Sequence, residues 1–189
     1  EFYTSRLMGT TLERMEALYG KKIHILSRPE VEVDPAWLVE AKEKDIVFLS
    51  GGDAMVSTTH LDLRLRAIQM GIKTDLVHAS SIVTAVSGLC GLQNYRFGRS
   101  TTIPFPYLAR GNRIVPQTPY QVLLENRERN LHTMLFLDIQ MDPAERFMTA
   151  NEGASLLMEM EANAIESGLE RAIAVGIARA GSPDATVKA

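Results

Sequence analysis

The sequence predicts an α/β protein of two domains. Short apolar runs that suit buried strands alternate with segments of helical periodicity, an order typical of mainly parallel sheets. Between Gln93 and Thr118 the chain becomes rich in Gly and Pro, which predicts a join between domains. We place the domains at residues 1–96 and 97–189, with a mainly parallel sheet in the first and a mixed sheet in the second.

The composition is that of a globular protein with a substantial core. The chain has 189 residues, 46% hydrophobic and 23% charged, and a net charge of -3. Without a basic block, this balance argues against nucleic acid as a partner. No apolar run approaches the roughly 20 residues that cross a membrane. The single cysteine, Cys90, excludes a disulfide framework or a cysteine metal site within one chain and favours a reducing, cytoplasmic location.

Capping signals and apolar periodicity predict four helices in the first domain. A capping box from Thr10 to Glu13 begins the first, over residues 11–19. Asp34-Pro35 begins the second. The third and fourth helices are recognised by apolar faces, at Leu61, Leu65 and Ile68 and at Ile82, Ala85, Val86 and Leu89. Short apolar runs predict strands at residues 23–26, 45–49 and 76–78.

The second domain is expected to contain two helices and three strands. The strands are predicted at residues 100–105, 133–138 and 172–178. One helix begins at Thr118-Pro119, and a Met-rich helix follows the capping-box pair Thr149 and Glu152. Aromatic and basic residues mix near the domain join, where they form either a surface for a protein substrate or a solvated linker. These residues are Tyr95, Arg96, Phe97, Arg99, Tyr107, Arg110 and Arg113.

Four predicted strands end in turns of small or polar residues. Ligands of open α/β sheets bind at such strand ends, where small residues let backbone amides approach and serine adds hydroxyls. Turns after strands are also small and polar when they bind nothing, and this interpretation stays open for each turn. The four turns are residues 50–53, 79–81, 137–138 and 178–182.

Asp53 argues against phosphate as the ligand of the first turn. A glycine turn before a helix commonly binds phosphate, but a carboxylate would repel it. The chain also has no Gly-Lys-Ser/Thr and no Gly-x-Gly-x-x-Gly after a strand. The acid suits a cationic or hydroxylated ligand such as S-adenosylmethionine. Alternatively, Asp53 caps a local turn or the helix that begins near Thr58.

Several stretches of the chain closely resemble the diphthine synthase family. They are Glu1 to Ser5 with Gly9 to Leu12, Gly52 to His60, His132 to Ile139, Met148 to Glu152 and Ala178 to Ser182. The family belongs to the tetrapyrrole methylase-like methyltransferases. The resemblance implies a cytoplasmic homodimer of two α/β domains that binds S-adenosylmethionine in the cleft between them. It also implies methyl transfer to the modified histidine of translation elongation factor 2 in diphthamide biosynthesis, with S-adenosylhomocysteine as the product.

The resemblance carries six cofactor contacts over to this sequence but no catalytic residue and no metal ligand. The six are Asp53, Val56, Ser81, Ile82, Leu137 and Ala180. The first turn reads Ser-Gly-Gly-Asp-Ala, where the family more often has Thr-Pro-Gly-Asp-Pro, and this loosens the turn without removing a ligand. Because the family begins earlier and continues past residue 189, we expect the chain to be incomplete at both ends.

The implied reaction is displacement at the sulfonium methyl by the amino nitrogen of the diphthine precursor, which also has a terminal carboxylate. The sulfonium is already activated, so the protein mainly positions the reactants and removes solvent. His60, His78 and His132 are possible proton acceptors, although a structural role is the first interpretation of each. Asp138 is likewise interpreted first as a turn cap.

Two alternative functions remain open from the sequence. One is a related tetrapyrrole methylase, against which the stretches at residues 1–5 and 132–139 discriminate. The other is an inactive cofactor-binding fragment, which would keep the fold without the activity.

Overall fold

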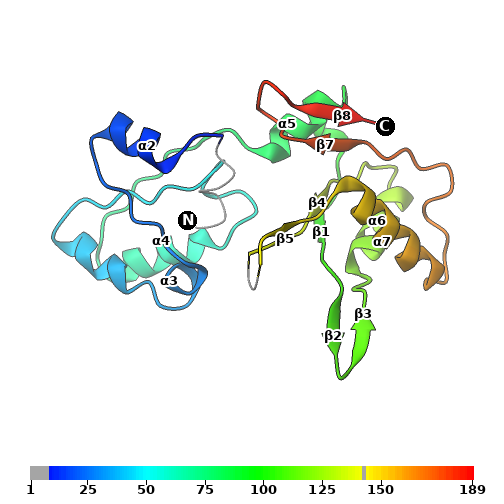
Figure 1. Cartoon of the computed structure of the whole chain (residues 1–189), viewed down its shortest axis with the longest axis horizontal. Coiled ribbons are helices and arrows are strands. Elements are labelled where there is room, and N and C mark those ends of the chain that lie inside the picture. Colours follow the sequence, from blue (N-terminus) through cyan, green and yellow to red (C-terminus); the bar gives the residue numbers. More distant parts are fainter. Residues whose placement is uncertain (1–8, 142–143) are drawn as a thin grey trace. The chain divides into compact units, whose positions relative to one another are not determined.

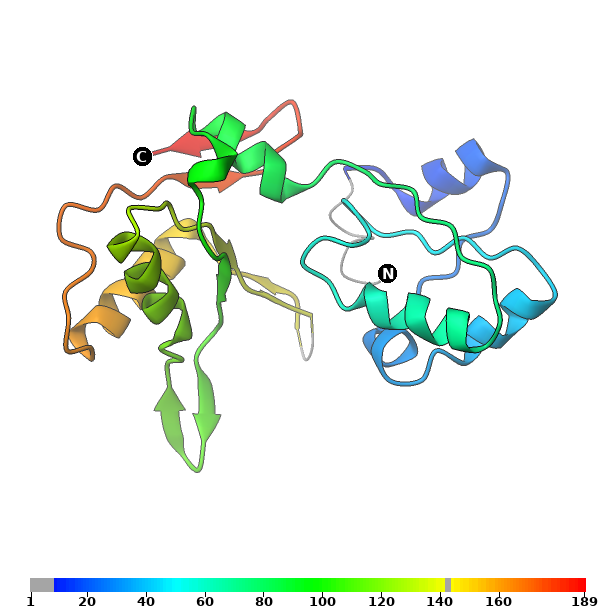
Figure 2. The same cartoon turned by 180° about the vertical axis from the view of Figure 1, so that it is seen from behind.

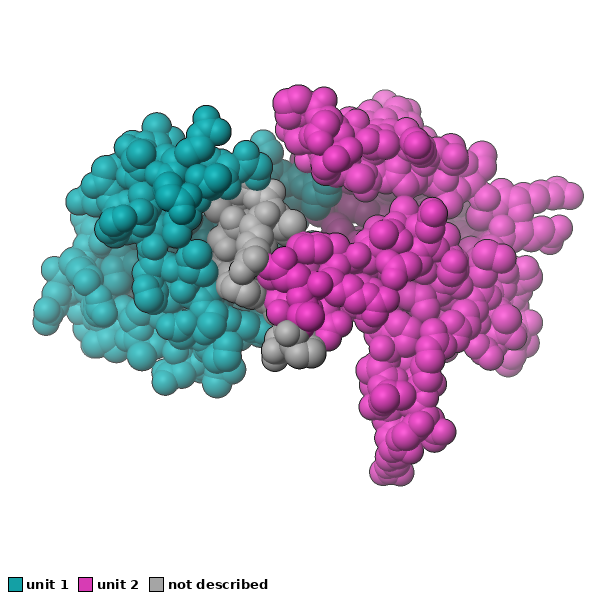
Figure 3. Space-filling view, viewed as in Figure 1, with its two compact units in different colours: residues 1–82 teal, residues 83–189 magenta. Residues whose placement is uncertain are grey.

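The computed structural model describes residues 9–141 and 144–189 (Figure 1). The chain divides into two compact units, residues 1–82 and residues 83–189, which Figure 3 colours separately. This division lies earlier in the chain than the predicted domain boundary between residues 96 and 97, and that boundary stays a prediction. The stretch Glu1 to Ser5, which contributes to the family resemblance, lies outside the described residues.

Helices dominate the described part of the first unit. They are α2 (Leu12–Tyr19), α3 (Arg28–Glu32), the 3₁₀ helix η1 (Ala36–Lys42) and α4 (His60–Gln69). The first helix ends where predicted but begins one residue later, and its cap is Thr11 rather than Thr10, since the Thr11 hydroxyl accepts a hydrogen bond from the N–H of Arg14. No helix was predicted at α3, because Pro29 follows the strand predicted at residues 23–26 and proline commonly ends a strand. Proline is equally at home in the first turn of a helix.

The buried side chains of the first unit come mainly from α3 and α4. Val31 and Ala67 are 2% and 3% exposed. The Phe48 ring stacks on Trp37 and meets the ring of His60 edge-on, with centroids 5.8 and 5.0 Å away. His60 is itself buried. These contacts support the structural interpretation of His60.

The apolar faces predicted for α4 and α5 (Ile82–Leu89) must be corrected. Leu61, Leu65 and Ile68 are about half exposed, whereas α4 buries its opposite side, including Leu63. In α5 the ends of the predicted face are exposed, and Ser87 is the buried residue. Periodicity tells which residues share a face, but only the neighbouring elements decide which face is covered.

The strands predicted at residues 23–26, 45–49 and 76–78 also require correction. Within residues 9–82 these segments have no strand pairing. Val47 and Val77 are 79% and 85% exposed. A strand is defined by hydrogen bonds to a neighbouring strand, so an apolar run without such a partner among the described residues does not become one.

The second unit contains parallel and antiparallel strand pairs. The strand β1 (Thr101–Ile103) pairs in parallel with β4 (Leu135–Leu137). The antiparallel pairs are β2 (Tyr107–Ala109) with β3 (Asn112–Ile114), β5 (Ile139–Gln140) with β6 (Arg146–Phe147), and β7 (Gly176–Ala178) with β8 (Thr186–Lys188). The three strands predicted here are thus confirmed in shortened form. Parallel and antiparallel pairs are both present, in separate two-stranded sheets.

The β2–β3 hairpin, which the sequence analysis missed, projects away from β1 in both views (Figures 1 and 2). Its turn residues Arg110 and Gly111 both have positive φ, of 51° and 80°. Two such residues give a turn whose twist matches that of the flanking strands. Arginine is an uncommon residue at such a position, which explains why the turn was not recognised from the sequence.

Two helices cover the parallel strand pair. The bounds are α6 (Thr118–Glu128) and α7 (Ala150–Ala162). Both helices begin where predicted, and Thr149 and Glu152 form the expected capping box. The short helix η2 (Asn94–Arg96) precedes β1. The hydrophobic core between these elements contains Ile103, Tyr120, Met148, Leu156, Leu157 and Met160.

Asn126 of α6 holds together the segments that enter β1 and β4. Its side chain is 2% exposed. Its Oδ1 accepts a hydrogen bond from the N–H of Arg99 (3.1 Å), and its Nδ2 donates to the Arg99 carbonyl (2.8 Å) and to the Thr133 hydroxyl (3.0 Å). A Cβ at Gly98 would lie 2.0 Å from Asn126 Oδ1, so a side chain at that position would push the amide out of place.

We expect Asn126→Ala to lower the free energy of unfolding by about 2–4 kcal/mol, because it empties a buried position and removes the partners of the Arg99 backbone groups. Urea unfolding followed by circular dichroism measures the change. The matched control is Asn112→Ala in the exposed β3 strand, which should stay within about 0.5 kcal/mol of the parent. Equal effects of the two substitutions would contradict this role of Asn126.

Candidate cofactor site

The turn around Asp53 is shaped by a glycine and by the Asp53 carboxylate. Gly52 has φ of +85°, which an L side chain rarely adopts. Asp53 Oδ1 accepts a hydrogen bond from the N–H of Met55 (2.9 Å). The N-cap of α4 is Thr59. Asp53 therefore caps the local turn, as one of the two structural interpretations expects, and does not cap the helix.

Asp53 also ties this turn to the segment that leads into α5. Its Oδ2 accepts a hydrogen bond from the N–H of Ala79 (3.2 Å) and lies 2.8 Å from Nδ1 of His78. The side chain is only 7% exposed, whereas His78 is 71% exposed. The hydrogen bond from Met55, followed by that from His78, lowers the pKa of Asp53 below its ordinary value. The turn thus presents a fixed anion with one remaining acceptor position, because a carboxylate offers about four.

The other predicted contacts of the first unit lie close to this anion along the chain. The N–H of Val56 donates to the Asp53 carbonyl at 3.3 Å, and the Val56 side chain is 38% exposed. Ser81 is half-buried and follows Ala79 by two residues, and Ile82 begins α5. The structure therefore brings Asp53 and Val56 into one turn and bonds that turn to the approach to Ser81.

Leu137 and Ala180 belong to the second unit. Leu137 ends β4 and packs against the hydrophobic core. Its side chain is therefore committed to packing, and its backbone is the part that a ligand could contact. Ala180 follows β7 and is half-buried.

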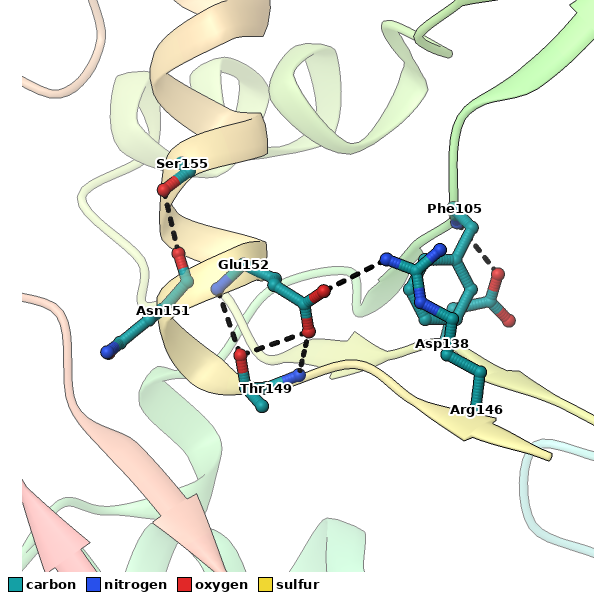
Figure 4. Close-up of polar contacts among 7 residues, drawn as sticks. All are labelled: Phe105, Asp138, Arg146, Thr149, Asn151, Glu152 and Ser155. Carbon is teal, nitrogen blue, oxygen red and sulfur yellow. Dashed lines mark hydrogen bonds and ion pairs between the residues drawn. The ribbon is translucent and has the colours of Figure 1, made fainter.

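Asp138, the acid that follows β4, also has a structural role. Its Oδ2 accepts a hydrogen bond from the N–H of Phe105 at 2.8 Å (Figure 4), and its Oδ1 accepts one from the N–H of Ile139 at 2.9 Å. The first bond links the segments that leave β1 and β4. The interpretation of Asp138 as a turn cap is supported.

The sequence analysis missed a depression of about 510 Å³ on the second unit. Its residues come from the segment after β1, the strands β3 and β6 and the first turns of α7. Of its lining residues, Glu152 was predicted only as a helix cap, and Arg113 was named as part of the mixed aromatic and basic group. The distance in sequence between the contributing segments left no local signal. The lining residues are Phe105, Pro106, Arg113, Arg146, Asn151, Glu152, Ser155, Leu156 and Glu159.

Within residues 9–141 and 144–189, no group of three or more His, Cys, Asp or Glu side chains is placed to hold a metal ion. Among the helices of these residues, none combines the length and the apolarity that crossing a membrane requires.

Comparison with known proteins decides the family. The family model of the Tetrapyrrole (Corrin/Porphyrin) Methylases matches residues 7–189. The diphthine synthase of Methanosarcina acetivorans is 59% identical over 190 residues, which cover 100% of this chain and 71% of that protein. The chain is a member of the diphthine synthase family. The diphthine synthase of Methanococcoides burtonii is 58% identical, with the same two coverages.

A crystal structure of diphthine synthase confirms the fold. It superposes with a TM-score of 0.80 and 39% sequence identity, over 95% of this chain and 65% of that chain. The predicted two-domain tetrapyrrole methylase-like fold is therefore confirmed. Diphthine synthases are S-adenosylmethionine-dependent methyltransferases of diphthamide biosynthesis, and the comparisons give no support to the alternative functions.

The stability contribution of Asp53 should depend on pH. Because its pKa is lowered from the ordinary value of 3.8, ionised Asp53 stabilises the fold above that pH. The contribution is lost as the pH falls through the lower folded-state pKa. We expect the full-length protein to resist urea better than Asp53→Asn near about pH 6, and the difference to shrink below about pH 4.

Asp75→Asn is the matched control for this experiment, because Asp75 is 82% exposed and its Lys73 partner lies 3.8 Å away. It should differ little from the parent at either pH. A stability difference for Asp53→Asn that stays constant from pH 6 into the acid range would contradict the assignment.

Proposed function

We propose that the protein transfers methyl groups from S-adenosylmethionine to the modified histidine of translation elongation factor 2, in diphthamide biosynthesis. The observation that carries the proposal is the 59% identity to a diphthine synthase over the whole of this chain. The chain spans 71% of that relative and 65% of the solved diphthine synthase chain, so the proposal concerns the full-length protein. We further propose that it is a cytoplasmic homodimer.

The residues of the first unit suit one side of this cofactor. The buried carboxylate of Asp53 keeps its charge and has an acceptor position left, which fits an ammonium or a ribose hydroxyl better than a phosphate. His78 is exposed, so a ligand hydroxyl or ammonium could replace it beside Asp53 at little cost. Ile82 begins the eight-residue helix α5 and directly follows Ser81, so the two proposed contacts are adjacent at the start of this helix.

In the second unit, Leu137 and Ala180 are proposed to contact the same cofactor through their backbones. Leu137 is the last residue of β4, and Ala180 lies two residues after the end of β7. Beyond a strand end, backbone groups no longer bond a neighbouring strand and can bind a ligand. Alanine at residue 180 leaves the approach open.

When bound, S-adenosylmethionine supplies a methyl group that its sulfonium already activates. The work of the chain is therefore to bind and orient the reactants and to exclude water. The attacking amine must be neutral, and its desolvation at the site lowers its pKa. No general base is assigned to the reaction. His60 is committed to its contacts with Phe48 and Ala54, and the exposed His78 contacts Asp53 at 2.8 Å.

The proposal predicts a mass gain of whole methyl groups on precursor-bearing elongation factor 2. The full-length protein is incubated with this substrate and S-adenosylmethionine, and the products are analysed by mass spectrometry. Elongation factor 2 without the precursor is the control and should keep its mass. An unchanged mass of the precursor form would contradict the proposed function.

Asp53→Ala in the full-length protein should raise the Kd for S-adenosylmethionine by about 10-fold or more, the cost of losing a hydrogen bond to a charged group. Calorimetric titration measures the Kd, after circular dichroism has established that the variant is folded. Asp62→Ala, which removes an exposed acid of α4 that pairs with Arg66 in the same helix, should leave the Kd unchanged. A parental Kd for Asp53→Ala would remove Asp53 from the proposed contacts.

A further inference from the structure

The depression of the second unit lies where the two parallel strands end. Phe105 follows β1 by two residues, and the bond from its N–H to Asp138 joins it to the end of β4. The first turns of α7 contribute Asn151, Glu152 and Ser155 (Figure 4). Ends of parallel strands are the usual ligand position in α/β folds, and about 510 Å³ falls within the size range of small-molecule sites. The location and size of the depression thus suit a ligand.

The charged residues of the depression form two pairs of opposite sign. Arg146 Nη2 lies 2.9 Å from Glu152 Oε1. Both terminal nitrogens of Arg113 bond the carboxylate of Glu159. The lining therefore has no net charge but has separated positive and negative groups. The two glutamates disfavour a phosphate and the two arginines disfavour a metal cation, whereas a ligand with one carboxylate and one ammonium matches both signs.

The guanidinium of Arg146 is held in a defined orientation. It lies over the Phe105 ring, 3.9 Å from the centroid, in cation–π contact. A planar guanidinium pairs with a carboxylate through two parallel hydrogen bonds. The side chains of Arg146 and Glu152 are 53% and 42% exposed, so their ion pair is weak and a ligand carboxylate can compete for Arg146 at little cost.

Glu152 keeps its charge and position if Arg146 turns to a ligand. Its Oε2 accepts hydrogen bonds from the N–H of Thr149 (2.9 Å) and from the Thr149 hydroxyl (3.1 Å). The backbone bond is the main reason that the pKa of Glu152 is lowered, with the bond to Arg146 second. The carboxylate thus remains an anion beside the space that a ligand would enter.

We propose that this depression binds an amino-carboxylate group, with the carboxylate on Arg146 and the amino group facing Glu152. This inference rests on the proposed function. Two reactants of that function contain an amino-carboxylate group: the diphthine precursor, and S-adenosylmethionine at its methionine end. Asp138, which accepts a hydrogen bond from the lining residue Phe105, directly follows the proposed cofactor contact Leu137. Arg146 and Glu152 are then ligand-positioning residues that no sequence motif identified.

The test compares Arg146→Ala and Arg146→Lys in the full-length protein. Calorimetry measures the Kd of each variant for precursor-bearing elongation factor 2 and, separately, for S-adenosylmethionine. We expect Arg146→Ala to raise one of these Kd values about 10-fold or more, since a bidentate charged contact is lost, and Arg146→Lys to restore part of the affinity. A rise for elongation factor 2 identifies the precursor as the ligand, and a rise for S-adenosylmethionine identifies the methionine end.

Arg28→Ala is the matched control, because Arg28 is an exposed arginine of the first unit that pairs with Glu32 at 2.6 Å. It should leave both Kd values unchanged. If both values for Arg146→Ala stay within about twofold of the parent, the inference is overturned. Failure of the proposed function would instead show as no methylation by the unmodified protein, a result that these binding measurements do not depend on.

Discussion

The second unit depends on the close approach of α7 to the strand pair β1 and β4. A Cβ at Gly153 would lie 2.7 Å from Cδ2 of Leu137 and 3.4 Å from Cδ1 of Ile103, so only glycine allows this separation. Glycine costs a helix about 0.5–1 kcal/mol relative to alanine. The close contact buries Leu156 and Met160 in return and sets the first turn of α7 beside the ends of both strands, which creates the charged depression.

The sequence predicted the elements whose signals are local. Capping residues located α2, α6 and α7 within one or two residues, because a cap and its helix are adjacent in the chain. Prediction from the sequence failed where the structure depends on contact with a distant segment. The apolar runs around Val47 and Val77 have no strand partner among the described residues. The exposed apolar side of α4 has the same explanation, since α3 packs on the other side. Family resemblance, rather than periodicity, identified the fold.

The candidate site divides in a similar way. Asp53 was recognisable because a lone acid in a glycine turn is chemically unusual, and the turn and its bond to Ala79 follow from short-range contacts. Arg146 was not recognisable, because its significance comes from Phe105, which lies far from it in the sequence, and from a glutamate that also caps α7. The role of Glu152 as a helix cap accounts for its presence in the sequence. Its second carboxylate oxygen was therefore given no functional interpretation.

The two acids at strand ends show how binding and structure share the same groups. Asp53 and Asp138 each accept backbone N–H bonds that join neighbouring segments, so part of their acceptor capacity is used before any ligand arrives. The groups that remain for a ligand are one acceptor position on Asp53, the backbone beside Leu137, and the Arg146 guanidinium. This guanidinium stacks on the ring of Phe105, whose N–H is bonded to Asp138. Removing either acid would therefore disturb the shape of its turn as well as any contact that the turn makes.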